Sequence, residues 1–333
     1  MAKIFFIAEA GVNHNGDLEK GKRLIEVAVE AGADAVKFQT WRTDLIVTQS
    51  AKQANYQIQN SGKIESQYDM LKRLELKYSD FEILSEHCRK HGIIFMSTPD
   101  EIESAKFLAN LQEIFKIGSG EITNLPFLRF IGALDKSIFL STGMSSLREV
   151  QEAIEVLQIA GTPLSKITIL HCTSQYPAPF IDINLRAMQT LRETFGINVG
   201  YSDHTLGIQV SIAAAALGAS VIEKHFTLDC NLPGPDHKAS IEPKELARLI
   251  TAIRDIEVAL GDGLKRAMPS EVANRDIVRK SIVANKPIAK GETFTPMNLT
   301  IKRPGSGISP MMWDSVIGRI AKKDFAVDDL ISL

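Results

Sequence analysis

Cysteine is scarce in this chain of 333 residues, and its three cysteines are Cys88, Cys172 and Cys230. An odd number of widely separated cysteines excludes a disulfide framework and a structural zinc site built from closely spaced thiolates. The cysteine content therefore favours a reducing cytoplasm as the location of the protein.

Long hydrophobic runs and an excess of charge of one sign are also missing. The longest apolar stretches, such as residues 210–217, are far too short to span a membrane. Residues 1–8 lead directly into the polar Glu9, so they resemble a first strand and not a signal peptide. The net charge of −2 argues against nucleic acid or an anionic membrane as the partner.

What is present is the composition of a globular enzyme, since 44% of the residues are hydrophobic. Short apolar runs alternate with amphipathic helical segments along most of the chain. The predicted strands cover residues 4–8, 35–38, 93–96, 114–117, 137–140, 166–170, 198–201 and 220–223. The predicted helices include residues 18–31, 79–91, 101–111, 147–160, 185–194, 208–217 and 243–260.

Eight strands that alternate with close to eight helices are typical of a (β/α)8 TIM barrel. A doubly wound parallel sheet has the same alternation and is the alternative fold, but the glycine fingerprint of dinucleotide-binding domains does not follow the first strand. In a barrel, the residues at the C-terminal ends of all eight strands converge on one mouth.

The domain boundaries follow from changes in this pattern. Residues 1–262 are predicted to form the catalytic barrel, with a long polar loop at 42–77 that contains a short helix at 67–74. Residues 263–276 are predicted to be a charged linker, and residues 277–333 a small, mainly β domain. Such a short domain has a marginal core, so we expect it to pack on something.

Two histidines follow neighbouring predicted strands and indicate a metal site. His204 comes after the strand at 198–201, and His225 comes after the strand at 220–223. Because parallel strands end at the same edge, their imidazoles are expected to lie side by side and to bind a divalent metal. Asp203 is a candidate to orient His204, and His14 is either a third ligand or a loop cap. The alternative is that both histidines are simply hydrogen-bonded to carboxylates.

Lysines and hydroxyl groups at the other strand ends suit an anionic ligand. Lys37 and Lys116, together with the Gly-Ser-Gly turn at 118–120, fit a phosphate and a carboxylate on one small molecule. The alternative is that these lysines form structural ion pairs with Glu9 and Glu223, and both interpretations can hold together. His171 and Cys172 do not form a catalytic pair in this prediction, because adjacent strand residues face opposite ways.

Several of these strand ends resemble the sialic acid synthase family. The motifs that carry the resemblance are EAGVNHNG (9–16), KFQT (37–40), FKIGSGE (115–121), STGM (141–144), YSDHT (201–205), EKHFT (223–227) and GPDHKAS (234–240). The segment KRPGSGISP (302–310) resembles the family's C-terminal antifreeze-like (SAF) domain. The motifs follow the family's order over almost the whole chain.

The resemblance implies a TIM-barrel enzyme that condenses phosphoenolpyruvate with N-acetylmannosamine to give N-acetylneuraminate and phosphate. A legionaminate-type synthase, which uses 2,4-diacetamido-2,4,6-trideoxymannose, is the alternative. The chemistry of this reaction points to Glu9, Glu121 and Lys116 as catalytic residues, and the resemblance implies His204 and His225 as the ligands of Mn²⁺, or else Mg²⁺ or Co²⁺. The implied substrate-binding residues are Lys37, Gln39, Ser119, Ser141, Tyr176, Ser202, Asp236 and Arg303.

The resemblance also implies a domain-swapped homodimer, in which Arg303 of the partner's small domain reaches the sugar. Ser174 departs from the family pattern, because some relatives have asparagine there. Three other classes are weighed against this function: a metal-dependent hydrolase, a non-catalytic sugar- or ice-binding protein, and a class I aldolase with a Schiff-base lysine. The hydrolase lacks its usual His-x-His pair on the first strand, and the binding protein leaves Lys37, Lys116 and both histidines without a role.

Overall fold

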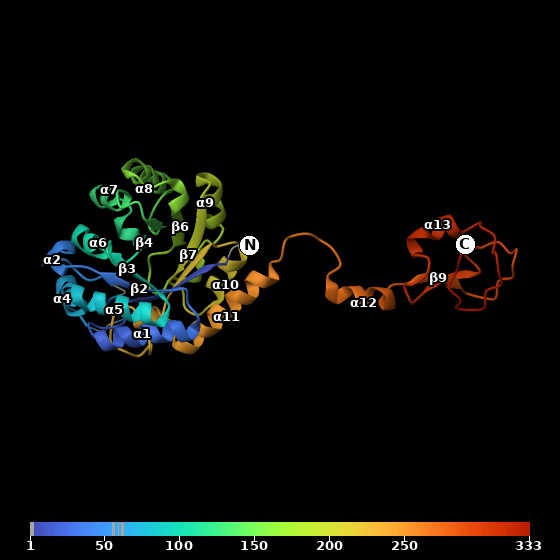
Figure 1. The fold of residues 1–333 in the computed structure, drawn as a ribbon, viewed down its shortest axis with the longest axis horizontal. Helices are drawn as coiled ribbons and strands as arrows, with labels where there is room; N and C mark the ends of the chain where they lie inside the picture. The colour runs from blue at the N-terminus through green and yellow to red at the C-terminus, as the bar shows by residue number, and fades with distance from the viewer. Residues whose placement is uncertain (1–2, 55–56, 59, 61–62) are drawn as a thin grey trace. The chain divides into compact units, whose positions relative to one another are not determined.

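The computed structural model describes residues 3–54, 57–58, 60 and 63–333 of the chain (Figure 1). The chain forms two compact units, Met1–Asp262 and Gly263–Leu333. The predicted loop at 42–77 includes residues 55–56, 59 and 61–62, which lie outside the described residues. In the part of the chain that the structure describes, no helix combines the length and the apolar character that a membrane span requires.

The first unit is a barrel of eight parallel strands surrounded by helices (Figure 1). The sheet order is β3-β2-β1-β8-β7-β6-β5-β4, and β3 and β4 at its two ends lie next to each other. The strands are β1 (Phe5–Gly11), β2 (Ala35–Thr40), β3 (Ile94–Pro99), β4 (Ile114–Ile117), β5 (Ser137–Ser141), β6 (Ile167–Cys172), β7 (Asn198–Asp203) and β8 (Val221–His225). The predicted TIM barrel is thereby confirmed, and the doubly wound alternative is wrong.

The helices of this unit lie outside the strands, and most of them pack apolar residues into the core around the sheet. They are α1 (Leu18–Ala31), α2 (Thr43–Ile46), α4 (Gln67–Leu74), α5 (Tyr78–His91), α6 (Ile102–Leu108), α7 (Leu125–Gly132), α8 (Leu147–Ala160), α9 (Ala187–Phe195), α10 (Gln209–Ala216) and α11 (Pro243–Ala259). Helix α1 shows why the sequence marks such bounds well. Asp17 accepts hydrogen bonds from the first-turn amides, and Gly32 ends the helix in the left-handed conformation at φ 83°.

The strands extend further than the apolar runs predicted. Strand β2 continues through Gln39 and Thr40, and strand β8 continues through His225, which the sequence pattern placed after the strand. The reason is that strand pairing depends on backbone hydrogen bonds, which polar residues make as well as apolar ones. The polar residues of the mouth are therefore held on rigid strands.

The barrel interior is layered, because every second residue of a strand points inward. One layer is apolar and consists of Ile7, Ala35, Met96, Phe139, Leu170 and Val221. Two positions later on the same six strands, in that order, come Glu9, Lys37, Thr98, Ser141, Cys172 and Glu223. The strand period therefore places a buried polar layer directly above this apolar layer.

The second unit has its own small core. It contains the antiparallel strands β9 (Ser281–Ala284) and β10 (Leu299–Lys302), and the helices α12 (Pro269–Val278) and α13 (Trp313–Val316). Residues such as Ile282, Phe294 and Phe325 form its hydrophobic cluster. Helix α12 occupies most of the segment that the sequence pattern predicted as a linker.

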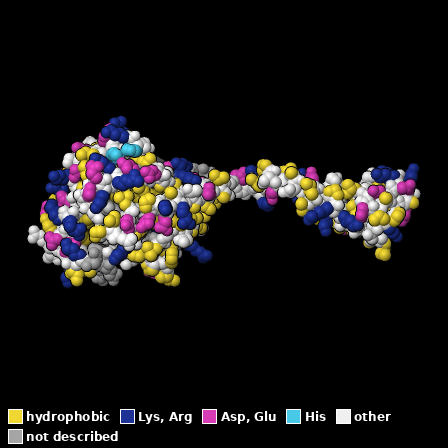
Figure 2. All heavy atoms as spheres, turned by 90° about the horizontal axis from the view of Figure 1, so that it is seen from below, with side chains coloured by type: hydrophobic (Ala, Val, Ile, Leu, Met, Phe, Trp, Pro, Cys, Tyr) yellow, Lys and Arg dark blue, Asp and Glu magenta, His cyan; other side chains and the backbone are white. Residues whose placement is uncertain are grey.

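On the face of the molecule in Figure 2, acidic and basic side chains are interspersed without a large patch of one sign.

Candidate active site

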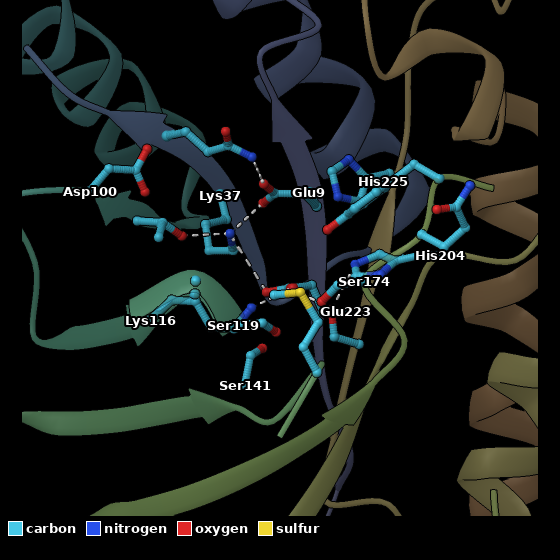
Figure 3. A pocket seen from close by; sticks show the side chains of 18 of the residues that line it. Glu9, Lys37, Asp100, Lys116, Ser119, Ser141, Ser174, His204, Glu223 and His225 are labelled. Atoms are coloured by element: carbon cyan, nitrogen blue, oxygen red, sulfur yellow. Dashed lines mark hydrogen bonds and ion pairs between the residues drawn. The ribbon is translucent and has the colours of Figure 1, made fainter. Parts of the chain in front are cut away.

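A cavity of about 830 Å³ opens at the C-terminal ends of the barrel strands (Figure 3). Ten residues predicted for the site line it together: Glu9, Lys37, Gln39, Lys116, Ser119, Ser141, Tyr176, Ser202 and the two metal candidates His204 and His225. Further lining residues include Asp100, Ser174, Gln175 and Glu223. Gln67 and Ala54, from the polar loop at 42–77, also reach the cavity.

Four buried charges form the floor of this cavity. The Nζ of Lys37 lies 2.8 Å from Oε2 of Glu9 and 3.7 Å from Oε2 of Glu223, and the Nζ of Lys116 lies 2.7 Å from Oε1 of Glu223. The predicted ion pairs are therefore present, and Figure 3 shows the same lysines facing the open cavity. Two cations and two carboxylates leave the floor balanced in charge, so an incoming anion must compete for the lysines.

The two carboxylates of the floor differ in their tendency to hold a proton. Burial raises the pKa of Glu9 to about 7, although Lys37 opposes this shift. Burial also favours the neutral form of Glu223, but Lys116 and Lys37 outweigh it and hold the pKa of Glu223 well below its usual range. Glu223 is therefore the permanent counter-ion of the lysines, while Glu9 can take up or release a proton near neutral pH.

The two histidines lie on one wall of the cavity with ring centroids 5.5 Å apart. Nδ1 of His204 donates to the carbonyl of Thr173 at 2.7 Å, which leaves the lone pair of Nε2 for the cavity. Nδ1 of His225 is buried and has no hydrogen-bond partner among the described residues. Burial lowers the pKa of His204 to about 4 and that of His225 well below its usual value, so both rings are neutral. Neutral imidazoles with available lone pairs fit a divalent metal.

The suggestion that Asp203 orients His204 is wrong. The carbonyl of Thr173 fills that role, and Asp203 faces the other side of β7. There its Oδ2 accepts from Nζ of Lys224 at 3.0 Å and from the hydroxyl of Ser211 at 2.6 Å, with all three residues buried. The alternation of strand residues explains the difference, because adjacent residues point to opposite faces.

His14 serves as a loop cap, and His171 and Cys172 diverge as predicted. Nδ1 of His14 accepts from the amide of Gly16 at 3.0 Å, and the ring is fully buried. The Nε2–H of His171 donates to the carbonyl of Ile183, whereas the sulfur of Cys172 lies 3.2 Å from the hydroxyl of Ser119. The sequence argument against a His–Cys catalytic pair is confirmed.

Two serine hydroxyl groups lie close to Gly143 at the edge of the cavity. A Cβ at Gly143 would lie 2.2 Å from Oγ of Ser174 and 2.7 Å from Oγ of Ser119, so any side chain there would displace both hydroxyl groups. The amide of Gly143 donates to the Ser119 hydroxyl at 3.1 Å. Ser174, whose role the sequence left open, thus stands beside Ser119 among donors that suit an anion.

Three predicted residues lie elsewhere. Asp236 lines a small adjoining cavity with Gln39 and Tyr176, and its Oδ2 is 3.9 Å from Nδ1 of His225. Glu121 lines a neighbouring cavity of about 540 Å³ and hydrogen-bonds Asn124. Arg303 belongs to the second unit, directly after β10.

Asp100 is a site residue that the sequence reasoning missed. It follows β3 immediately, and burial raises its pKa to about 7, with a further contribution from Glu121. It lines both the main cavity and the cavity that contains Glu121. The available signal was its position, since a carboxylate next to the end of a barrel strand faces the mouth.

Comparisons with known proteins extend over both units. The NeuB family matches residues 24–265, and the SAF domain family matches residues 279–333. The chain is 54% identical over 332 residues to the N,N'-diacetyllegionaminic acid synthase of Campylobacter jejuni, with 99% of each chain covered. It is 47% identical to the N,N'-diacetyllegionaminic acid synthase of Legionella pneumophila, covering 94% of this chain and 89% of that one. A solved N-acetylneuraminic acid (sialic acid) synthetase from Leptospira borgpetersenii superimposes with a TM-score of 0.71 at 35% identity, covering 82% of this chain and 90% of that one.

Proposed function

Because this chain belongs to the NeuB family and is a sialic acid synthase-type enzyme, we propose that it condenses phosphoenolpyruvate with 2,4-diacetamido-2,4,6-trideoxymannose to give N,N'-diacetyllegionaminic acid and phosphate. The observation that carries this choice of sugar is the 54% and 47% identity to two N,N'-diacetyllegionaminic acid synthases. N-acetylmannosamine, the acceptor first expected from the sequence, remains the second candidate, supported by the likeness to a sialic acid synthetase at 35% identity.

Phosphoenolpyruvate binding is assigned to the floor of the cavity. Lys37 and Lys116 face the cavity and supply positive charge, and Ser119 and Ser141 add hydroxyl donors at its wall. Ser202 donates to Oε1 of Glu223 at 2.7 Å, so it holds the carboxylate that in turn holds Lys116. This arrangement keeps the lysine ammonium groups in place before the anion arrives.

The acceptor sugar is assigned to the outer part of the cavity. Tyr176 packs its ring against His204 with centroids 4.1 Å apart, and the Nε2 of Gln39 donates to Glu9 at 3.2 Å. His204 and His225 would hold a divalent metal there, for which Mn²⁺ remains our proposal; such an ion polarises the aldehyde of the sugar. Asp236, whose Oδ2 lies 3.9 Å from Nδ1 of His225, is assigned to the same sugar site. We propose that Arg303 of a partner chain completes it.

The reaction forms a bond between the enol carbon of phosphoenolpyruvate and the aldehyde carbon, water adds to C2, and the C–O bond to phosphate breaks. Glu9 has a pKa of about 7, so its carboxylate can take the proton of the attacking water. The aldehyde oxygen needs a proton when the new bond forms. Asp100 is our candidate to donate that proton, because its pKa is also about 7. We propose that Glu121 acts on this step through Asp100, whose proton affinity it increases.

The affinity for phosphoenolpyruvate should depend on pH through Glu9. Because the pKa of Glu9 is raised to about 7, its carboxyl group is mainly neutral below pH 7, and Lys37 is then available to the anion. Above pH 7 the carboxylate is charged, so it pairs with Lys37 and repels the anion. We expect the Kd for phosphoenolpyruvate, measured by calorimetry, to rise between about pH 6.5 and about pH 8.5, by at most roughly tenfold per pH unit. Glu9→Gln should flatten this rise. Parallel profiles in the two proteins would assign the dependence to the ligand's own ionisation instead.

The test of the proposed function is phosphate release by the purified protein with phosphoenolpyruvate and Mn²⁺. 2,4-Diacetamido-2,4,6-trideoxymannose and N-acetylmannosamine are compared side by side, each with and without EDTA. We expect metal-dependent turnover with kcat/KM at least about tenfold higher for the diacetamido sugar, a difference of one well-made polar contact. Preference for N-acetylmannosamine would reverse the assignment of the sugar. Turnover of neither would refute both acceptors.

A further inference from the structure

We propose that Glu26, His87 and His91, on the outside of the barrel, form a binding site for a divalent transition metal of the Zn²⁺ class that is separate from the mouth. Glu26 lies on α1, and both histidines lie on α5, which packs beside α1. One ligand atom from each of the three side chains lies within 4.8 Å of the other two. Among the described residues this is the group of three metal-binding side chains that meets that spacing.

The helix geometry brings the two histidines together. His87 and His91 are four residues apart on α5, so they share one face of the helix, and their ring centroids are 4.3 Å apart. The Nδ1–H of His91 donates to the carbonyl of His87 at 2.9 Å, which leaves the lone pair of the other ring nitrogen. A backbone hydrogen bond of this kind fixes the tautomer and orientation that metal-binding histidines need.

The third side chain completes the donor set from the neighbouring helix. The Nε2 of His87 lies 3.4 Å from Oε1 of Glu26, and this nitrogen is buried without a hydrogen-bond partner among the described residues. Two donors bound tetrahedrally at about 2.0–2.1 Å from Zn²⁺ are about 3.3–3.4 Å apart, so the spacing suits a shared ion. The other oxygen of Glu26 accepts from Arg23 at 2.8 Å, which holds the carboxylate in place.

The donor types indicate which ions the site accepts. Two imidazoles and one carboxylate suit Zn²⁺, and also Co²⁺ or Ni²⁺, and leave a fourth position open to water because His91 is exposed. Mg²⁺ prefers oxygen donors and should bind here poorly. A bound ion would link α1 to α5 and so stabilise the folded barrel wall, without any contact with the residues of the mouth.

The experiment is Zn²⁺ and Co²⁺ binding to the full chain after removal of metal with a chelator. We expect about two equivalents of Zn²⁺ for the wild type and about one for His204→Ala/His225→Ala, whose remaining site gives the visible spectrum of Co²⁺ with nitrogen ligands. In that background His91→Ala should weaken the remaining site by about tenfold or more and abolish the rise in melting temperature caused by Zn²⁺.

The matched control is Glu86→Gln, which changes an acidic residue of the same helix that pairs with Arg89 outside the group. It should leave metal affinity and the melting shift unchanged. His91→Ala alone should leave Mn²⁺-dependent turnover unchanged, since His91 lies outside the cavity of the mouth. The proposal is overturned if the double variant at the mouth binds no Zn²⁺, or if His91→Ala binds it as tightly as the parent; the interaction of Glu26 with His87 is then an ordinary ion pair.

Discussion

Replacing His204 or His225 by alanine is expected to reduce turnover by roughly 10³-fold or more while the barrel stays folded. The two rings are the neutral nitrogen donors on the wall of the cavity, and each variant removes one of them. Loss of either should lower Mn²⁺ affinity, measured by calorimetry, together with the rate of phosphate release. The far-ultraviolet circular dichroism spectrum should remain that of the wild type.

His171→Gln is the matched control for this prediction. Its strand, β6, adjoins β7, but the ring of His171 bonds the carbonyl of Ile183 and lines a different cavity. We expect its turnover and Mn²⁺ affinity to stay within a few-fold of the wild type. Full Mn²⁺-dependent activity in His204→Ala or His225→Ala would contradict the assignment of the metal site.

Lys116→Met is expected to reduce kcat/KM for phosphoenolpyruvate by roughly 10²- to 10³-fold, the usual loss when one group that stabilises a developing negative charge is removed. It should also destabilise the barrel, because the buried Glu223 carboxylate loses its nearer cation and keeps the Ser202 hydroxyl at 2.7 Å and the more distant Lys37 at 3.7 Å. Breaking a buried pair from one side costs about 3–5 kcal/mol in the free energy of unfolding. Steady-state kinetics and urea denaturation measure the two effects.

The double variant Lys116→Met/Glu223→Gln separates them. It removes both charges of the pair, so stability should largely return while activity stays low. Lys136→Met is a control at the other end of the barrel. Lys136 directly precedes β5, and its ammonium group donates to the carbonyls of Ala109 and Gln112. That variant should lose some stability and keep kcat/KM. Recovery of activity in the double variant would show that Lys116 serves only to neutralise Glu223.

The fold was largely predictable from local features of the sequence. Helix α1 was predicted to its exact residues, since Asp17 and Gly32 are strong signals for a helix start and end. Helix α7 was not singled out, and its core residues Phe127, Leu128 and Ile131 form a short segment that competes with the strand pattern. Strand ends were placed too early, as at His225, because an apolar run does not mark where backbone pairing stops.

The barrel, the family and the set of polar side chains at the strand ends can all be predicted from the sequence, because they depend on period, caps and motifs along the chain. The pairing of those side chains follows from the tertiary structure instead. Glu9, Lys37 and Glu223 lie far apart in the sequence and meet because β2, β1 and β8 are neighbours in the sheet. Burial raises the pKa of Glu9 to about 7, whereas pairing with the two lysines keeps the pKa of Glu223 well below its usual range. No local sequence pattern encodes that difference.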